Sequence, residues 1–178
     1  MWLEIGCGAG EHLVAHALAR PDVGFLACEP YVTGVAALLA RLRDHRLEDR
    51  VRVHTEDARP LIGRLGSASI DRLFLLFPDP WPKRRHHRRR FIQQETVDQM
   101  VRILKPDGAL LFASDHMDYV RWTLSIAAGH SGLRWCAEDA DDWRSPPGDW
   151  PGTRYERKAL ARGSRCVYLR FQRQGSKL

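Results

Sequence analysis

The chain has 178 residues and a formal net charge of +6, with 28 Lys and Arg against 22 Asp and Glu. This length fits one domain with a full hydrophobic core, and the basic balance favours an acidic partner. The 4 cysteines lie far apart and no apolar run is long enough to span a bilayer, so we expect no disulfide framework, no metal site and no membrane anchor. Because no signal peptide opens the chain, we expect a cytoplasmic protein.

Strands and helices alternate in the predicted secondary structure. Strands are predicted at residues 1–5, 24–29, 51–55, 70–77, 109–113, 133–137 and 165–171. Helices are predicted at residues 11–20, 32–46, 60–65, 91–104 and 117–128. This order favours an α/β fold, with one Rossmann-like, doubly wound, mostly parallel sheet, helices on both faces and an antiparallel final strand.

Residues 143–158 contain too much Pro and Gly to predict a regular element and too many aromatic and charged residues for a linker. We expect them to form a functional loop. The last three residues, Ser176, Lys177 and Leu178, match a peroxisomal address, to which we give little weight. We expect residues 1–178 to form a single domain.

A glycine-rich turn joins the first predicted strand to the first helix. Gly6, Gly8 and Gly10 alternate there, so that backbone N–H groups and the helix N-terminus can approach a ligand closely. The dinucleotide fingerprint requires its third glycine one position later, where this chain has Glu11. Glu4 would repel a phosphate and attract the ammonium of an amino acid.

Two further acids follow the next two predicted strands. Glu29 is placed to accept both hydroxyls of a ribose, and Asp57 to accept an adenine amino proton. Three acids at adjacent strand ends, without a phosphate ligand, suit S-adenosylmethionine. Alternatively, Glu4 could cap a turn, Glu29 could be a surface acid, and Asp57 could be a helix N-cap.

The most informative segment is residues 77–90. Three prolines end the fourth predicted strand and frame Asp79 and Trp81. A basic block, residues 83–90, follows, and its six Lys and Arg equal the net charge of +6. A carboxylate and a flat aromatic group beside a cationic surface suggest an active site for a nucleic-acid base. The alternatives are a turn acid at Asp79, core packing by Trp81 and a solvated charge run.

Four segments resemble the bacterial tRNA (guanine-N7)-methyltransferases, a branch of the class I methyltransferases that use S-adenosylmethionine. They are residues 4–11, residues 78–86 with their basic tail, Ser114 with Asp115, and residues 153–156. The resemblance implies the class I methyltransferase fold and transfer of a methyl group to guanine N7 in the tRNA variable loop. It runs over nearly the whole chain.

The resemblance also implies roles for individual residues, with Asp79 as the acid of the catalytic site and no metal. The implied cofactor contacts are Glu4, Gly6, Gly8, Gly10, Glu29 and Asp57. The implied contacts to the target nucleoside are Lys83, Asp115, Thr153, Arg154, Tyr155 and Glu156. Contacts to tRNA phosphates are expected from Arg84, Arg85, Arg88, Arg89 and Arg90. Asp115 could instead be a helix N-cap, and Arg154 could pair with Glu156.

One departure from the family motivates a rival hypothesis. Family members usually carry a segment before the first strand, and this chain starts almost at that strand, so we expect the extension to be missing. The rival is an RNA-binding module of this fold with weak or no turnover. A methyltransferase acting on another nucleobase atom or on a small molecule is a third possibility, and the basic block disfavours the small molecule. The sequence favours neither a monomer nor a homodimer.

Overall fold

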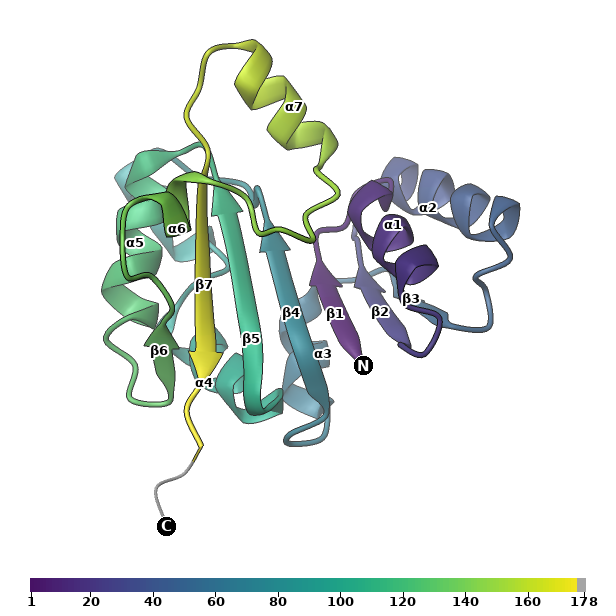
Figure 1. Ribbon diagram of the computed structural model, residues 1–178, viewed down its shortest axis with the longest axis horizontal. Helices are drawn as coiled ribbons and strands as arrows, with labels where there is room; N and C mark the ends of the chain where they lie inside the picture. Colours follow the sequence, from purple (N-terminus) through teal and green to yellow (C-terminus); the bar gives the residue numbers. More distant parts are fainter. Residues whose placement is uncertain (176–178) are drawn as a thin grey trace.

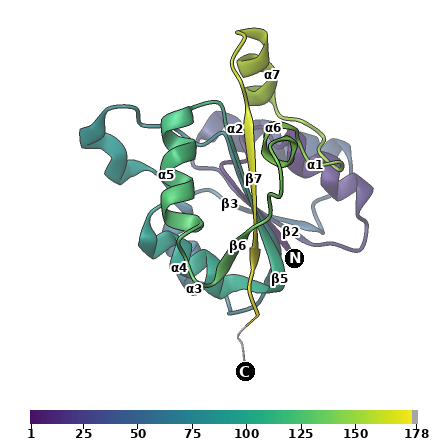
Figure 2. The same ribbon diagram turned by 60° about the vertical axis from the view of Figure 1, so that its left-hand side comes forward.

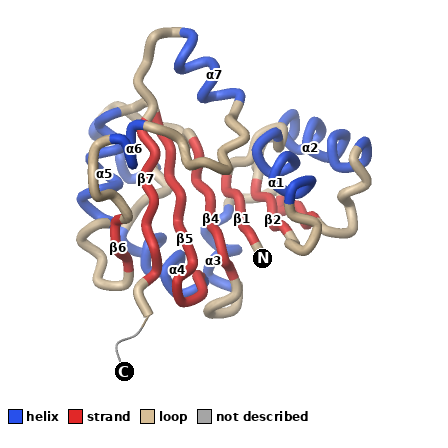
Figure 3. The backbone as a smooth tube through the Cα atoms, in the orientation of Figure 1, coloured by secondary structure: helices blue, strands red, loops and turns tan. Residues whose placement is uncertain are grey.

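The computed structural model describes residues 1–175, so the match to a peroxisomal address lies outside the described residues. The 7 strands form one sheet (Figures 1 and 3). They are β1 (Trp2–Ile5), β2 (Phe25–Cys28), β3 (Val51–His54), β4 (Ile70–Leu76), β5 (Leu104–Ser114), β6 (Leu133–Trp135) and β7 (Val167–Arg173). The helices are α1 (Glu11–Ala19), α2 (Val32–Asp44), α3 (Ala58–Arg64), α4 (Gln94–Ile103), α5 (Met117–Ala127), α6 (Asp141–Arg144), α7 (Arg154–Ala161) and the 3-10 helix η1 (Arg84–Arg89).

The sheet order is β3-β2-β1-β4-β5-β7-β6. Strands β1 to β5 pair in parallel, whereas β7 is antiparallel to both β5 and β6. This topology confirms the predicted doubly wound sheet with an antiparallel final strand. The order of the strands reverses between β1 and β4, which in open α/β sheets is where a ligand-binding crevice forms.

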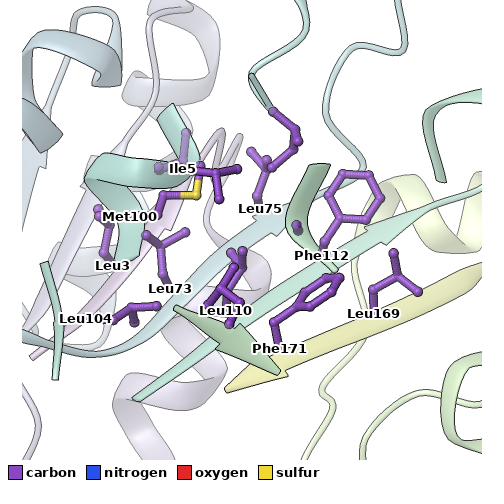
Figure 4. Packing of buried hydrophobic residues seen from close by; sticks show 14 of the residues in the cluster. Leu3, Ile5, Leu73, Leu75, Met100, Leu104, Leu110, Phe112, Leu169 and Phe171 are labelled. Atoms are coloured by element: carbon purple, nitrogen blue, oxygen red, sulfur yellow. The ribbon is translucent and has the colours of Figure 1, made fainter. Parts of the chain in front are cut away.

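Hydrophobic cores lie on both faces of the sheet, because side chains of a strand alternate between faces. One core packs α3, α4 and α5 against Leu3, Ile5 and the apolar residues of β4, β5 and β7. Figure 4 shows part of this core, with Met100 of α4 near Leu3, Ile5 and Leu73. The other packs α1 and α2 against Trp2 and its neighbours. Leu3 and Leu73 are fully buried, and each such leucine contributes roughly 1.5–3 kcal/mol to stability.

Two predicted segments differ most from the structure. The predicted loop 143–158 contains the end of α6 and the start of α7, because Thr153 and Glu156 form a reciprocal capping box that starts α7. The predicted strand 109–113 is part of the longer β5, which begins at Leu104. Residues 105–108, which lie between the predicted helix 91–104 and the predicted strand, form an irregularity within β5, where the pairing with β4 shifts between Ile70 and Arg72.

A hydrogen-bonded chain of ionisable side chains lies in the α1 core. Nδ1 of His12 donates to Oε2 of Glu4 at 2.7 Å, and Nε2 of His12 lies 3.2 Å from Nε2 of His16. Both imidazoles are buried, and His16 stacks on Phe74. Burial, together with the neighbouring His12, lowers the pKa of His16 from 6.5 to about 4.

This shift predicts that stability falls as the solution is acidified. Between pH 6.5 and about pH 4 the unfolded chain binds a proton at His16 that the folded protein does not bind, so the free energy of unfolding decreases as pH falls. The loss amounts to about 3 kcal/mol across this window. Urea unfolding at several pH values measures it. His16→Gln should make the free energy of unfolding depend less steeply on pH, whereas His45→Gln, at an exposed position, should not. An equal pH dependence in both variants would contradict the assignment of this effect to His16.

Candidate active site

The carboxyl ends of the parallel strands open into a cleft of about 340 Å³. It spans the reversal between β1 and β4, and α7 stands above this edge of the sheet (Figure 1). The residues that line it come from strand ends, the start of α3, the segment after β4, and α7. They are Ile5, Gly6, Cys28, Glu29, Pro30, Tyr31, Glu56, Asp57, Ala58, Arg59, Leu75, Leu76, Phe77, Pro78, Asp79, Trp81, Arg89, Phe91 and Tyr155. The volume lies in the range of small-ligand sites.

The glycine turn contributes Gly6 to the wall of this cleft. Gly6, Gly8 and Gly10 all have positive φ, at 74°, 55° and 77°. A Cβ on Gly10 would lie 2.3 Å from Cδ1 of Leu38, so glycine at position 10 lets α1 approach α2. The predicted turn is therefore required both for its backbone conformation and for helix packing.

Glu29 ties the end of β2 to this turn. Its Oε2 accepts from the backbone N–H of Gly8 at 2.7 Å, and its Oε1 accepts from the backbone N–H of Tyr31 at 2.9 Å. The residue is buried, with 4% of its surface exposed, yet it lines the cleft. Because a carboxylate oxygen accepts more than one hydrogen bond, Glu29 can hold the turn and also bind a ligand hydroxyl.

Asp57 lies beyond β3 and is the N-cap of α3. It accepts from the backbone N–H of Arg59 at 2.9 Å, and Nη1 of Arg59 lies 2.6 Å from its other oxygen. Nη2 of Arg59 donates to the carbonyl of Arg89 at 3.0 Å. The N-cap alternative is therefore correct, and it is compatible with a place in the cleft wall. Arg59 links this wall to the basic block.

The segment after β4 makes the opposite wall and is strained. Phe77 and Trp81 have φ of 49° and 44°, in the left-handed region that bulky residues rarely adopt. Asp79 lies between them, with an exposed side chain, and lines the cleft with Trp81. Such strain persists where surrounding contacts fix the backbone, and it is concentrated at functional sites. We call residues 77–81 the corner.

The basic block forms η1 and projects from the protein beside α5 (Figure 2). Lys83, Arg84, Arg85, Arg88 and Arg89 are exposed. Arg89 also lines the cleft, with its guanidinium carbon 4.8 Å from the centre of the Trp81 ring. Arg90 is different, since only 1% of its surface is exposed and its guanidinium is bonded inside the protein. This burial contradicts the predicted phosphate contact of Arg90.

Helix α7 brings Tyr155 over the glycine turn. A Cβ on Gly8 would lie 3.7 Å from the Tyr155 ring, and Tyr155 is 55% exposed. The helix is anchored through Glu156, which is buried and accepts from Nε1 of Trp150 at 2.8 Å and from the hydroxyl of Tyr168. Burial and the bond to Glu156 raise the pKa of Tyr168. The alternative that Glu156 pairs with Arg154 is therefore wrong.

The predicted site residues thus divide into two groups. The cleft brings together Gly6, Glu29, Asp57, Asp79, Arg89 and Tyr155. The predicted residues that are not in its wall are Glu4, Gly8, Gly10, Lys83, Arg84, Arg85, Arg88, Arg90, Asp115, Thr153, Arg154 and Glu156. The Glu4 carboxylate bonds to His12 in the α1 core. Asp115 lies 3.6 Å from Arg162, and the N-cap of α5 is its neighbour His116.

Sequence reasoning did not identify several residues of the cleft wall. Arg59 follows the N-cap by two residues, where its side chain can reach back to Asp57. Tyr31 follows Glu29 by two residues, and Phe91 immediately follows the basic block. In each case, closeness in sequence to a residue already assigned to the site was the signal that could have identified it.

A second cavity, of about 420 Å³, lies between residues 141–150 and the strands β5 and β7, and its lining contains none of the predicted site residues that the structure describes. Among residues 1–175 no group of three His, Cys, Asp or Glu could hold a metal ion. No helix in the same range combines the length and apolarity that crossing a bilayer requires.

Comparisons with solved structures agree with this fold. The precorrin-6y C5,15-methyltransferase of Geobacter metallireducens GS-15 has a TM-score of 0.64 at 14% identity, over 97% of this chain and 79% of that one. A SAM-dependent O-methyltransferase of Thermotoga maritima has a TM-score of 0.60 at 16% identity, over 99% of this chain and 60% of that one. At these identities the likeness shows the class I methyltransferase fold alone.

Sequence comparisons are more specific. The family described as "Putative methyltransferase" matches residues 1–169. A tRNA (guanine-N(7)-)-methyltransferase of Ruegeria sp. (strain TM1040) is 53% identical over 98% of this chain and 68% of its own length. One of Roseobacter denitrificans is 51% identical over 98% of this chain and 74% of its own length. The chain belongs to the family of tRNA (guanine-N(7)-)-methyltransferases.

Proposed function

We propose that this protein transfers a methyl group from S-adenosylmethionine to N7 of a guanine in the variable loop of tRNA. The observation that carries the proposal is one cleft that unites Glu29 and Asp57 on one wall with Asp79 and Trp81 on the other. We also propose that residues 1–178 act as a single catalytic domain. The family names of the relatives support the substrate and the position of methylation.

The cleft suits a nucleoside that carries a positive sulfonium and no phosphate. Glu29 offers carboxylate oxygens for the ribose hydroxyls, and Asp57 and Glu56 lie in the part of the cleft wall where we expect adenine to bind. Ile5 and Leu75 add apolar surface to the same cleft. When bound, S-adenosylmethionine supplies a methyl group activated by the sulfonium charge. Tyr155, which lies over the glycine turn, stays a proposed contact of the target nucleoside. A contact of Glu4 with the ammonium stays a prediction.

Methyl transfer to N7 depends mainly on how the protein positions the guanine and the methyl donor. Guanine N7 has a free lone pair in the plane of the ring, so no proton leaves before it attacks. The protein must align N7, the methyl carbon and sulfur. Asp79 accepts hydrogen bonds from N1–H and the exocyclic amine of guanine, or supports the positive charge that develops on the ring. Trp81 offers a flat surface beside it.

The basic block binds the substrate backbone in this proposal. Its exposed cations neutralise tRNA phosphates and bring the variable loop to the cleft, where the target base is unstacked or flipped out. Lys83, Asp115 and Arg154 are proposed contacts of the target nucleoside. A tRNA substrate and the 4 free thiols support a cytoplasmic location.

Neutralising part of the basic block should weaken tRNA binding in a salt-dependent way. For Arg84→Gln with Arg85→Gln we expect a lower affinity and a log K against log salt plot that is less steep by about 1 per lost phosphate contact. Fluorescence anisotropy with labelled tRNA at several salt concentrations measures both. Arg43→Gln with Arg64→Gln, at exposed positions outside the block, is the matched control. Equal slopes for the two double variants would contradict the role of the block.

The function itself is tested by incubating the protein with labelled S-adenosylmethionine and unmodified tRNA. We expect incorporation into tRNA, and strand cleavage by borohydride and aniline at the methylated guanine. Binding of tRNA without incorporation would favour the RNA-binding module. Incorporation without cleavage would point to another nucleobase atom.

A further inference from the structure

Arg90 is the last residue of the basic block, and it is buried whereas the Lys and other Arg residues of the block are exposed. Its Nε donates to the carbonyl oxygen of Pro80 at 2.9 Å, and its Nη2 is bonded to the carboxylate of Asp118. The guanidinium carbon lies 5.0 Å from the ring centre of Tyr119 and 5.3 Å from that of Trp122. Only 1% of the surface of Arg90 is exposed, so its guanidinium acts inside the protein.

The carbonyl that Arg90 holds belongs to the corner that carries Asp79 and Trp81. Pro78, Pro80 and Pro82 have no N–H, so the backbone there has few donors of its own. The N–H of Phe77 donates to the carbonyl of Ala113 at 2.7 Å and fixes the start of the corner. In the described part of the chain, the bond from Arg90 is the one hydrogen bond that reaches residues 78–82.

The corner needs such a bond because its backbone is strained. Phe77 and Trp81 both adopt positive φ, a conformation that relaxes unless other contacts hold it. The anchor itself is rigid, since Arg90 lies between the Asp118 carboxylate and two aromatic rings of α5. Helix α5 is therefore connected to the reacting groups through one guanidinium.

We propose that Arg90 is a positioning residue for methyl transfer, which holds the Asp79 carboxylate and the Trp81 ring at the cleft through the carbonyl of Pro80. The inference rests on the proposed function and deepens it. Asp79 and Trp81 flank the held carbonyl directly, so a shift of Pro80 moves both of them. Misplacement of reacting groups by an ångström costs rate even where no contact to the ligand is lost.

Arg90→Lys tests the proposal. Lysine keeps the charge, but its single nitrogen cannot bond the Pro80 carbonyl and Asp118 as the guanidinium does. We expect the single-turnover rate at saturating S-adenosylmethionine and tRNA to fall about tenfold. The dissociation constants of both ligands should stay within about twofold of wild type, because Arg90 contacts neither. An unchanged rate would overturn the proposal, as would a loss of rate that saturating ligand restores.

The matched control is Arg102→Lys. Arg102 also holds backbone carbonyls, with Nη1 2.7 Å from the oxygen of Leu65 and Nη2 2.8 Å from that of Ile62, away from the cleft. It should lower the melting temperature without changing the single-turnover rate. If both variants lose rate in proportion to melting temperature, Arg90 is only structural. Should Arg90→Lys fail to fold, Asp118→Asn replaces it, and an unchanged rate in that variant overturns the proposal.

A second readout separates this inference from the proposed function. Hydrogen exchange of the peptide over residues 77–85 reports the order of the corner without any activity. We expect faster exchange there in Arg90→Lys than in wild type or Arg102→Lys, and equal exchange overturns the inference. A wild-type protein that methylates no tRNA overturns the proposed function, and the exchange measurement still decides whether Arg90 holds the corner.

Discussion

Asp79→Ala is expected to reduce the rate of methyl transfer by about 100- to 1,000-fold, the usual cost of removing one group that stabilises developing charge or orients the reactant. Binding of S-adenosylmethionine should change little, because the Asp79 side chain is exposed on the wall opposite Glu29. Single-turnover kinetics with saturating cofactor and tRNA measure the rate, and isothermal titration measures the cofactor affinity.

Asp44→Ala is the control for this variant. Asp44 is an exposed acid at the last residue of α2, and it does not line the cleft. It should leave both the rate and the affinity unchanged. If Asp79→Ala turned over at the wild-type rate, the corner would not carry the reaction, and the assignment of Asp79 would be wrong.

Glu29→Gln is expected to weaken binding of S-adenosylmethionine by about 10- to 100-fold. A hydrogen bond to a charged group is worth roughly 1.5–3 kcal/mol, and each 1.4 kcal/mol is tenfold in affinity. Glutamine keeps the size of the side chain but offers one acceptor oxygen in place of two. It therefore cannot accept from the N–H groups of both Gly8 and Tyr31, and it loses the charge that we propose binds the ribose hydroxyls.

Isothermal titration of the cofactor into the variant measures this loss, and saturating cofactor should restore much of the rate. Glu48→Gln, at an exposed position beyond α2, should bind as the wild type does. A wild-type affinity in Glu29→Gln would remove Glu29 from the cofactor site. We assign Asp79 to the rate of methyl transfer and Glu29 to the affinity for the cofactor, and that division of roles would then be wrong.

The fold could be predicted because its signals are local. Apolar runs such as residues 73–77 and periodic helices such as residues 32–46 are fixed by the spacing of side chains. Thr153 and Glu156 carried a capping-box signal that would have predicted α7, but the surrounding Pro and Gly suggested a loop. The extent of β5 was not readable either, because residues 105–108 look like a turn and are included only by pairing across the sheet.

The candidate site was predictable only in part. Glu29, Asp57 and Asp79 follow strands whose carboxyl ends meet at one edge, so their shared place in the cleft follows from the topology. Arg90 could not be separated from its neighbours, because a run of like charges carries no information about which member turns inward. Its partner Asp118 is 28 residues away in sequence.

The sequence alone determined the alternation of strands and helices, the glycine turn, and the order of acids along the sheet edge, because these depend on residue spacing and backbone preference. The tertiary structure decided which side chains face the cleft. Glu4 bonds to His12 rather than lining it, Tyr155 covers the turn, and Arg90 is buried beneath the corner. Such choices depend on contacts between residues distant in the chain, and packing and desolvation settle them only once the elements have come together.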